Sequence, residues 1–335
     1  GHVMRCLAVA ELLKNQSKSI VFICRKSDAD LIPYIQKQGY QVVALSALES
    51  KQNLSNVSVE ELVLQTLKRY EPCICIVDHY EIDWRWESAI YPFCEQLCVI
   101  DDLANRKHCC DILLDSELGD KKAKYQKLLP SASKLLLGPS YALLRADFTK
   151  LTPFVQKKMD AFQSVKVILI NMGAYDQKNI IPTIIQVILS LNLNIKIRIV
   201  ISSKSPNIQE IRLLAKKHDD LITLRCDVKE MALEIIKSDL AIGSVGGSAY
   251  ERAVLGVSGC VIPTAENQDN IAREFERLEI ARLVVLNQYF VQNLTFALVT
   301  FIESPKLLKK MAINGVKKVD VYGADNFVSQ LLEGY

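Results

Sequence analysis

The stretch DLAIGSVGGSAYERAVLGV (239–257) combines glycines, serines and a carboxylate in an order that could bind a nucleotide. An apolar, strand-like run leads into the glycines, and an amphipathic helical pattern follows them. Glycines let a backbone approach a ligand closely, and free N–H groups at the positive end of a helix suit a pyrophosphate. We therefore predict a pyrophosphate site at Gly246, Gly247 and Ser248.

Glu251 lies four residues after Gly247, one turn into the predicted helix. A carboxylate at this position could accept hydrogen bonds from both hydroxyl groups of a ribose. The alternative is an ordinary glycine-rich turn in which Glu251 forms a surface ion pair. The lysine of a P-loop and the glycine spacing of a dinucleotide fingerprint are both absent, so neither motif is predicted.

Two further strand ends offer groups for the same ligand. At a strand-to-helix turn, the amides of Asn267 and Gln268 could read a base or a sugar hydroxyl group, or Asn267 or Thr264 could simply cap the helix. The run VKVILINMG ends at Gly173 and is followed by Asp176, which could face a cleft between domains or cap the next helix.

The first half of the chain carries titratable groups at the end of an apolar run, in the stretch CICIVDHYEID (73–83). Charged groups at the end of a buried strand are costly unless they are paired, so Asp78, His79 and Tyr80 indicate a site. The alternative is that Asp78 caps a helix and His79 is exposed.

A second strand end carries two adjacent carboxylates, Asp101 and Asp102. Neighbouring residues of a strand point to opposite faces, so the pair is not expected to share one proton, and a structural role is expected for one of them. Further along, Tyr141 and Arg145 could reach a cleft between domains, or Arg145 could tie the edge of the domain down.

The chain opens with GHVMRC, which places a histidine where a helix begins. Residues 3–14 have a helical pattern, and the positive end of a helix keeps an imidazole neutral, so His2 could act as a general base. The alternative is a turn residue that faces solvent. A strand normally precedes such a helix, and we expect that strand and its glycine loop to be missing from the chain.

These groups need elements to position them, and strand-like runs alternate with helical patterns along the whole chain. The alternation predicts two doubly wound α/β domains, residues 1–150 and 165–335, whose last helix could return to the first domain. The stretch 151–164 is polar and weakly periodic and marks the joint. The terminal helical segments are expected to break at Gly315 and Gly323.

Composition narrows the class of protein. Half of the 335 residues are hydrophobic and the formal net charge is +3, which gives no reason to expect nucleic acid or an anionic membrane as the partner. No apolar run approaches the roughly 20 residues of a membrane-spanning helix. The ten cysteines lack paired C-x2-C spacing, so a zinc site is not expected, and free thiols fit a reducing cytoplasm.

Several motifs occur together in one order, and together they resemble a known family: GHVMR, DHY, DDLANRKHCCDILLD, GPSYALLRADF, NMGAYDQKN, GGSAYERAVLG and ENQDNIA. The chain is similar to the UDP-sugar hydrolases of pseudaminic acid biosynthesis from residue 1 to about residue 285. The resemblance implies a GT-B fold, in which two Rossmann-like domains face each other across a cleft. It also implies hydrolysis of a UDP-linked diacetamido-trideoxyhexose without metal or cofactor.

The resemblance also implies roles for individual residues. His2 would activate water to attack the anomeric carbon with inversion as UDP leaves. The residues expected to contact the substrate are Arg5, Asp78, His79, Tyr80, Asp101, Tyr141 and Arg145. The residues expected to bind the nucleotide are Gly173, Gly246, Gly247, Ser248, Glu251, Asn267 and Gln268.

One motif departs from the family pattern, because Gly173-Ala174-Tyr175-Asp176 stands where the family often has two glycines, a small hydroxyl residue and an aspartate. This departure affects the phosphate contact expected there. Two other functions fit the same nucleotide half. One is a GT-B glycosyltransferase, which needs an acceptor site, and the other is an inactive protein that binds nucleotide sugars.

Overall fold

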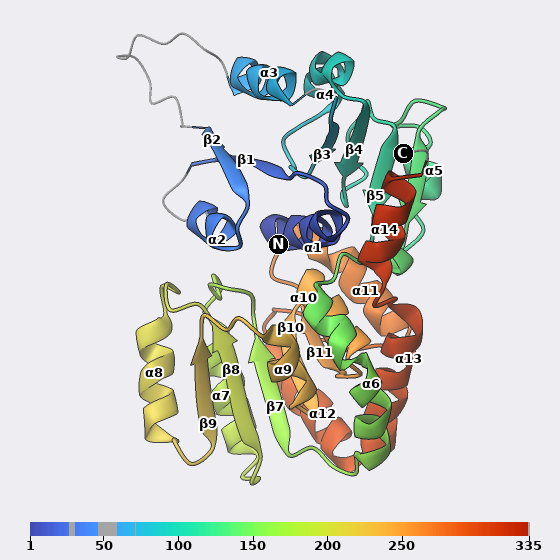
Figure 1. The fold of residues 1–335 in the computed structure, drawn as a ribbon. Helices are drawn as coiled ribbons and strands as arrows, with labels where there is room; N and C mark the ends of the chain where they lie inside the picture. The colour runs from blue at the N-terminus through green and yellow to red at the C-terminus, as the bar shows by residue number, and fades with distance from the viewer. Residues whose placement is uncertain (27–30, 46–58, 71, 334–335) are drawn as a thin grey trace. The chain divides into compact units, whose positions relative to one another are not determined.

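The computed structural model describes residues 1–26, 31–45, 59–70 and 72–333, with side chains left undescribed at 59–60. The chain divides into two compact units, which are described separately (Figure 1). The first unit contains Gly1–Arg145 and Ala324–Tyr335, and the second contains Ala146–Gly323. None of the described helices is long and apolar enough to cross a membrane. All ten cysteines are free thiols.

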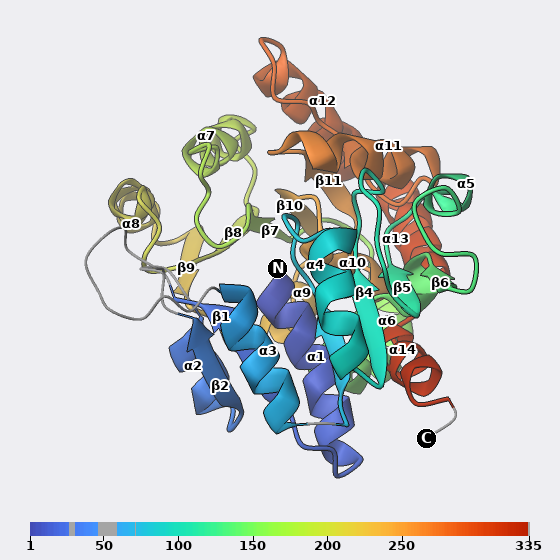
Figure 2. The same cartoon turned by 90° about the horizontal axis from the view of Figure 1, so that it is seen from above.

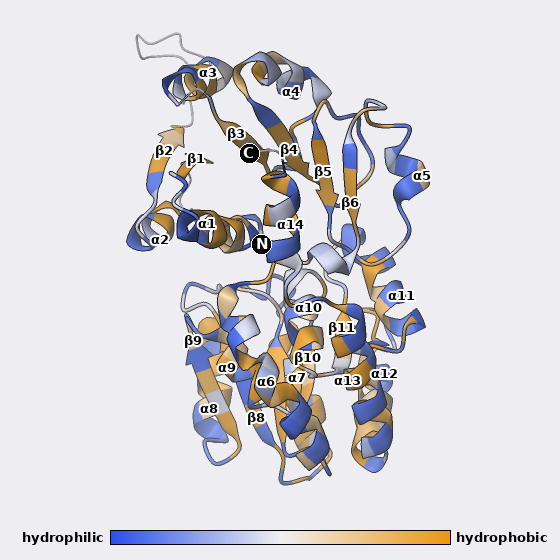
Figure 3. Cartoon of the chain, turned by 45° about the vertical axis from the view of Figure 1, so that its right-hand side comes forward, coloured by the Kyte–Doolittle hydropathy of each residue, from blue (hydrophilic) through white to orange (hydrophobic). Residues whose placement is uncertain are grey.

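The first unit is built on parallel strands. One sheet pairs β1 (Val21–Arg25) with β2 (Gln41–Leu45). The other has the order β3-β4-β5-β6 and contains Ile74–Val77, Gln96–Ile100, Ile112–Asp115 and Lys134–Leu137. These strands are the apolar runs of the sequence, and Figure 3 shows their hydrophobic character.

Helices cover both faces of the four-stranded sheet because alternate strand residues point to opposite sides. Cys98 and Ile100 pack with α1 (His2–Asn15) and α14 (Gly323–Leu331). Leu97 and Val99 belong to the core on the other side, to which three more helices contribute: α3 (Val59–Arg69), α4 (Trp84–Ile90) and α5 (Lys122–Tyr125). Helix α2 (Ile32–Lys37) packs on β2. Figure 2 shows this unit from above.

The second unit has one parallel sheet of six strands in the order β12-β11-β10-β7-β8-β9. The strands, in chain order, are Val167–Asn171 (β7), Lys196–Ile201 (β8), Ile222–Cys226 (β9), Leu240–Ser244 (β10), Gly259–Ile262 (β11) and Arg282–Leu283 (β12). Strands β8 and β9 follow β7 in order on one side of it, and β10, β11 and β12 follow in order on its other side. The strand order therefore reverses between β7 and β10.

Two groups of helices sandwich this sheet. The main core contains residues of α7 (Ile181–Ser190), α8 (Ile208–Lys217) and α12 (Phe290–Glu303). A second group consists of helices that contact one another: α6 (Ala146–Ala161), α9 (Met231–Ile236), α10 (Gly247–Val254) and α13 (Pro305–Lys318). Helix α11 (Asp269–Arg277) contacts β11 and β12. Both units are thus Rossmann-like, as the sequence predicts.

Two expectations about helices are wrong. The stretch 151–164, taken as a polar joint, lies mostly within α6, whose buried residues Phe148, Val155 and Met159 recur at helical spacing. Its Pro153 lies inside the helix and hid the pattern. Gly315 does not break a helix either, because α13 continues through it and packs it against Ala253 of α10. Gly323, by contrast, is where α14 begins.

Candidate functional site

In the second unit, polar groups gather at the carboxyl edge of the sheet, where the strand order reverses. β7 and β10 are neighbours, with Asn171 opposite Gly243, so the loops that follow them leave the sheet side by side. Ligands of open parallel sheets bind at such a reversal, since the two loops turn away in opposite directions and leave a crevice.

The two loops meet at Gly173 and Ser244. A side chain built at Gly173 would begin 3.9 Å from the Ser244 hydroxyl, and Gly173 has a φ of +80°. Gly246 has a φ of +128°, where other residues would be strained, and lies at the N-cap of α10 without a side-chain cap. Among the described atoms, nothing lies within 4 Å of a Cβ placed at Gly246 or Gly247. The backbone at these two glycines is therefore open on the side where other residues carry a side chain, and the first N–H groups of a helix have no partner within the helix.

The other residues expected at this site lie on the same edge. Glu251 is half-buried, one turn into α10, and Ser248 stands in its first turn. Asn267 is exposed after β11, which neighbours β10. The side chain of Gln268 accepts hydrogen bonds from the backbone N–H and hydroxyl group of Thr264, at 2.8 and 3.2 Å. Gln268 thereby fixes its own loop.

Asp176 caps the next helix, which is the second of the two roles that the sequence allowed. Its carboxylate accepts the backbone N–H groups of Ile180 and Ile181, at 3.1 and 2.9 Å, where α7 begins. The side chain is buried, and burial raises the pKa of Asp176 although these two hydrogen bonds oppose the rise. Asp176 therefore anchors the start of α7.

In the first unit, Arg5 joins two carboxylates from separate strand ends. Its Nε and Nη2 donate to Asp78, at 2.7 and 2.5 Å, and its Nη1 donates to Asp102 at 3.0 Å. The side chains of Asp78 and Asp102 are only 4% and 7% exposed. Asp78 is thus held by a bidentate ion pair, which fixes the orientation of its carboxyl group. The alternative in which Asp78 caps a helix does not occur.

His2 lies against this cluster. Its Nε2 is 4.0 Å from Asp78, and its ring meets the ring of Tyr80 edge-on with 4.6 Å between the centroids. Burial lowers the pKa of His2, and the nearby charge of Arg5 lowers it further, against the opposing effect of Asp78. The imidazole is therefore neutral at physiological pH and can accept a proton.

The two residues that follow Asp78 in the DHY motif, His79 and Tyr80, have different contacts. Tyr80 is partly exposed and donates its hydroxyl to Asp102 at 3.2 Å. Burial and the charge of Asp102 raise the pKa of Tyr80, which keeps the phenol protonated. The Nδ1 of His79 accepts the backbone N–H of Glu81, and its carbonyl accepts a hydrogen bond from Arg106. Tyr80 and Asp102 therefore belong to the charged cluster.

Asp101 was expected beside the substrate, but its side chain is fully buried. It accepts hydrogen bonds from Arg106 at 2.6 Å, from the backbone of Ala104 at 2.9 Å and from Tyr125 at 3.0 Å. Burial raises the pKa of Asp101, but hydrogen bonds from His108 and from the backbone of Ala104, together with the positive charges of Arg106 and His108, hold it well below its usual range. Asp101 is the structural member of the aspartate pair, and Asp102 faces Arg5.

A second charged group, which no sequence motif indicated, lies near Asp102. Lys121 pairs with Asp115 at 2.8 Å and with Glu117 at 3.0 Å, and it donates to the carbonyl of Asp102 at 2.7 Å. Burial raises the pKa of Glu117 to about 8, helped by Asp102 and Asp115 and opposed by Lys121. These residues stand after β5 with only ordinary turn spacing, so their convergence depends on the fold.

Tyr141 and Arg145 remain at the end of the first unit. Tyr141 is half-buried and packs against the core formed by α1, β4–β6 and α14. Arg145 is also half-buried, and it is the last residue of the first unit before α6. Tyr141 therefore supports the core that carries α1.

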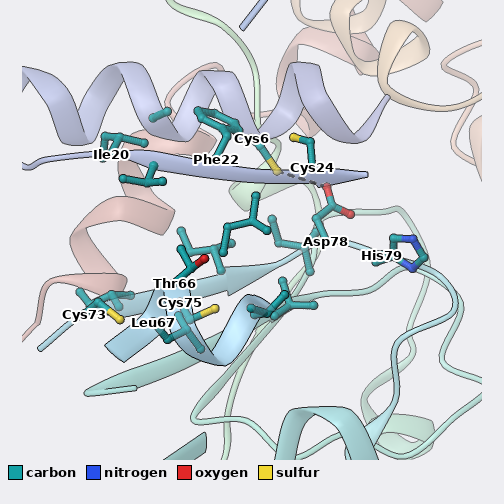
Figure 4. Close-up of a pocket in the computed structure, with 18 of the residues that line it drawn as sticks. Cys6, Ile20, Phe22, Cys24, Thr66, Leu67, Cys73, Cys75, Asp78 and His79 are labelled. Carbon is teal, nitrogen blue, oxygen red and sulfur yellow. Dashed lines mark hydrogen bonds between the residues drawn. The ribbon is translucent and has the colours of Figure 1, made fainter. Parts of the chain in front are cut away.

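A cavity of about 1110 Å³ opens between α1, β1, α3 and β3. Figure 4 shows Asp78 and His79 at one end and apolar side chains such as Ile20 and Leu67 at the other. The Cys6 thiol donates to Asp78 across 3.5 Å. Within the described part of the chain, no cluster of three or more histidine, cysteine or acidic side chains is arranged to hold a metal ion.

No protein-family model matches the chain. The chain is 30% identical over 273 residues to the UDP-2,4-diacetamido-2,4,6-trideoxy-beta-L-altropyranose hydrolase of Campylobacter jejuni, which covers 81% of this chain and 89% of the relative. It is 27% identical over 277 residues to the uncharacterized protein MJ1062 of Methanocaldococcus jannaschii, which covers 80% of this chain and 54% of that protein. The chain thus spans about half the length of the archaeal relative.

Solved structures identify the fold. MurG of Acinetobacter baumannii matches with a TM-score of 0.68 at 14% identity, over 99% of this chain and 96% of that one. The UDP-GlcNAc 2-epimerase of Neisseria meningitidis matches with a TM-score of 0.63 at 17% identity, over 99% and 97%. The two Rossmann-like units therefore form a GT-B fold, as expected. Because the Campylobacter relative is 30% identical over most of both chains, the chain belongs to the family of UDP-2,4-diacetamido-2,4,6-trideoxy-β-L-altropyranose hydrolases.

Proposed function

We propose that the protein hydrolyses a UDP-linked diacetamido-trideoxyhexose to UDP and the free sugar. The observation that carries this proposal is a neutral histidine, His2, beside the carboxylate of Asp78, which Arg5 holds in a bidentate ion pair. The sequence similarity to the Campylobacter jejuni hydrolase, whose name specifies such a substrate, supports the same reaction. We also infer that this reaction belongs to pseudaminic acid biosynthesis.

In the proposed reaction, His2 takes a proton from a water molecule as that water attacks the anomeric carbon. The bond from this carbon to the diphosphate oxygen breaks, and the configuration of the sugar inverts. Asp78 stabilises the imidazolium that forms, because its carboxyl group lies 4.0 Å from Nε2. Arg5 holds Asp78 and Asp102 in place.

The nucleotide is assigned to the second unit. Its diphosphate binds the free N–H groups at Gly246, Gly247 and Ser248, and the positive end of α10 stabilises the charge of the departing UDP. Glu251 accepts the ribose hydroxyl groups, and Asn267 contacts the uridine. The backbone and the helix end supply positive potential, so the proposed reaction requires no metal.

The test is incubation of the protein with the UDP-sugar in the absence of any acceptor, with UDP and sugar followed by NMR. We expect hydrolysis that continues in excess chelator and is lost in His2→Ala. His218→Ala is the control, since His218 lies at the end of α8 in the second unit. Its rate should equal that of the parent.

Other outcomes identify the alternatives. Release of UDP only when an acceptor sugar or lipid is added would indicate a glycosyltransferase. Binding of the UDP-sugar without turnover would indicate a binding protein. Hydrolysis by His2→Ala at the parental rate would show that another group is the base, and loss of hydrolysis in chelator would show that a metal takes part.

A further inference from the structure

We propose that Arg252, a buried cation that pairs with no carboxylate among the described residues, positions the glycine-rich turn and supplies the charge that selects a diphosphate there. This inference rests on the proposed binding of UDP at that turn. It adds a residue that does not touch the ligand and that the sequence motifs did not indicate. It also states the class of ligand, a nucleoside diphosphate in preference to a nucleoside.

The guanidinium of Arg252 forms hydrogen bonds with both ends of the turn, at Ser244 and at Ser248. The side chain is 3% exposed. Its Nη2 donates to the carbonyl of Ser244 at 2.9 Å, and its Nη1 donates to the hydroxyl group of Ser248 at 3.3 Å. Since Gly246 and Gly247 lie between these two serines, one side chain fixes the span of backbone whose N–H groups would bind phosphate.

Gly243 makes room for this guanidinium. A Cβ at Gly243 would lie 2.5 Å from Nη1 of Arg252, 2.9 Å from its Cζ and 2.7 Å from the carbonyl oxygen of Asn171. No side chain at position 243 could fit without moving the arginine or the neighbouring strand. The sheet therefore leaves a gap for Arg252 where the strand order reverses.

The charge of Arg252 is not balanced within the described part of the protein. Arg198 in the same unit forms an ion pair with Glu234 at 2.5 Å, and Arg5 in the first unit contacts two carboxylates, whereas Arg252 forms no such pair. Burial lowers the pKa of Arg252 to about 10, opposed by the charge of Glu251, so the group is still protonated at neutral pH.

A buried charge without a partner is unfavourable, and an anion bound nearby offsets that cost. The bonds of Arg252 to the turn place its charge next to the N-terminus of α10, so the two positive potentials add. A bound diphosphate would complete the charge pair through the turn. A nucleoside without phosphates would gain nothing from Arg252.

The test compares UDP with uridine in Arg252→Met, which keeps much of the volume and removes the charge. Isothermal titration should show UDP affinity weakened by about 10-fold or more, the effect of losing a charged interaction. Uridine affinity, measured by NMR, should not change. The melting temperature without ligand should be equal to or above that of the parent, because an unpaired buried charge is gone.

Arg198→Met is the matched control, since it removes an arginine that has a carboxylate partner in the same unit. It should lower the melting temperature and leave UDP affinity unchanged. If Arg252→Met does not fold, Arg252→Lys takes its place. A lysine cannot bridge Ser244 and Ser248 as a fork, so weaker UDP binding with unchanged uridine binding is again expected.

Two results would overturn the inference alone: parental UDP affinity in the variant, or an equal loss for UDP and uridine, which would show only a change of shape. If the parent protein itself does not bind UDP, the proposed function fails and this inference fails with it. The measurement on the parent therefore separates the two failures.

Discussion

Arg5 makes three hydrogen bonds to carboxylates that lie 73 and 97 residues away along the chain. An arginine used in this way has little capacity left for a substrate. Its hydrogen bonds hold Asp78 in place next to His2. We therefore treat Arg5 as a positioning residue, although its place in the sequence motif suggested direct contact with the sugar.

Arg5→Lys tests this role. A lysine keeps the charge but cannot form the two parallel bonds to Asp78, so Asp78 and His2 should shift. We expect kcat to fall by about 100-fold while KM changes little, because misplacement affects the reacting groups more than binding. Steady-state hydrolysis assays measure both constants.

Arg85→Lys is the control, since the Arg85–Asp83 pair is of the same type but lies at the surface, with the arginine 75% exposed. It should leave both constants unchanged. A tenfold rise in KM with an unchanged kcat for Arg5→Lys would indicate that Arg5 binds the substrate after all.

The pH profile of hydrolysis tests His2 directly. Burial and Arg5 lower the pKa of His2 below its ordinary value of 6.5, and only the neutral imidazole can accept a proton. The rate should therefore be half-maximal at a pH below 6.5, and at still lower pH the logarithm of the rate should fall by one for each pH unit. A decline centred above pH 6.5 would contradict a buried neutral base.

At the scale of elements, the reversal of strand order between β7 and β10 brings Gly173 and the 244–248 turn together. The position of this glycine-rich turn depends on the position of α10, and α13 packs against α10. The contact is close because Gly315 has no side chain. A Cβ there would lie 3.2 Å from the Cα, Cβ and carbonyl oxygen of Ala253.

Gly315→Val should push α13 away from α10. Overpacking of this kind costs about 2 kcal/mol, so the free energy of unfolding should fall by that amount and UDP affinity should weaken with it. Chemical denaturation and isothermal titration measure the two effects. Lys317→Val, on an exposed position of the same helix, should change neither. Unchanged stability of Gly315→Val would mean that the two helices can separate without loss.

At the scale of the whole molecule, stability depends on buried charges away from both candidate sites. His108 and Glu87 are fully buried, with Nδ1 of His108 2.7 Å from Glu87, and Glu87 also accepts the backbone N–H of Cys109 at 2.6 Å. Burial alone would lower the pKa of His108, but Asp101 and Glu87 raise it to about 9.

Glu87→Gln should lower the free energy of unfolding at pH 7 by about 3 kcal/mol, the usual cost of breaking a buried pair. The pKa of His108 is raised in the folded state, so its contribution is complete below pH 6.5 and is lost as the pH rises through about 9. Denaturation at several pH values should show this decline in the parent and a smaller one in the variant. Glu95→Gln, at an exposed residue, is the control.

The sequence by itself determined the strands, the two-unit α/β organisation and the glycine-rich turn, because hydrophobic periodicity and glycine placement are local properties of the chain. It failed at 151–164, a polar and weakly periodic stretch that looked like a joint between domains, and at Gly315, which looked like a helix breaker. Tertiary packing overrode both signals, since α6 buries Phe148 and α13 needs a residue without a side chain against α10.

Only the tertiary structure decided which charged groups act together. Motif spacing could not show that Arg5 binds Asp78 and Asp102, that Asp101 is buried, or that Arg252 holds its turn while pairing with no carboxylate that the structure describes. Each of these facts joins residues from separate elements or depends on burial. Charge pairing acts over a few ångströms of space, whereas the sequence records only separation along the chain.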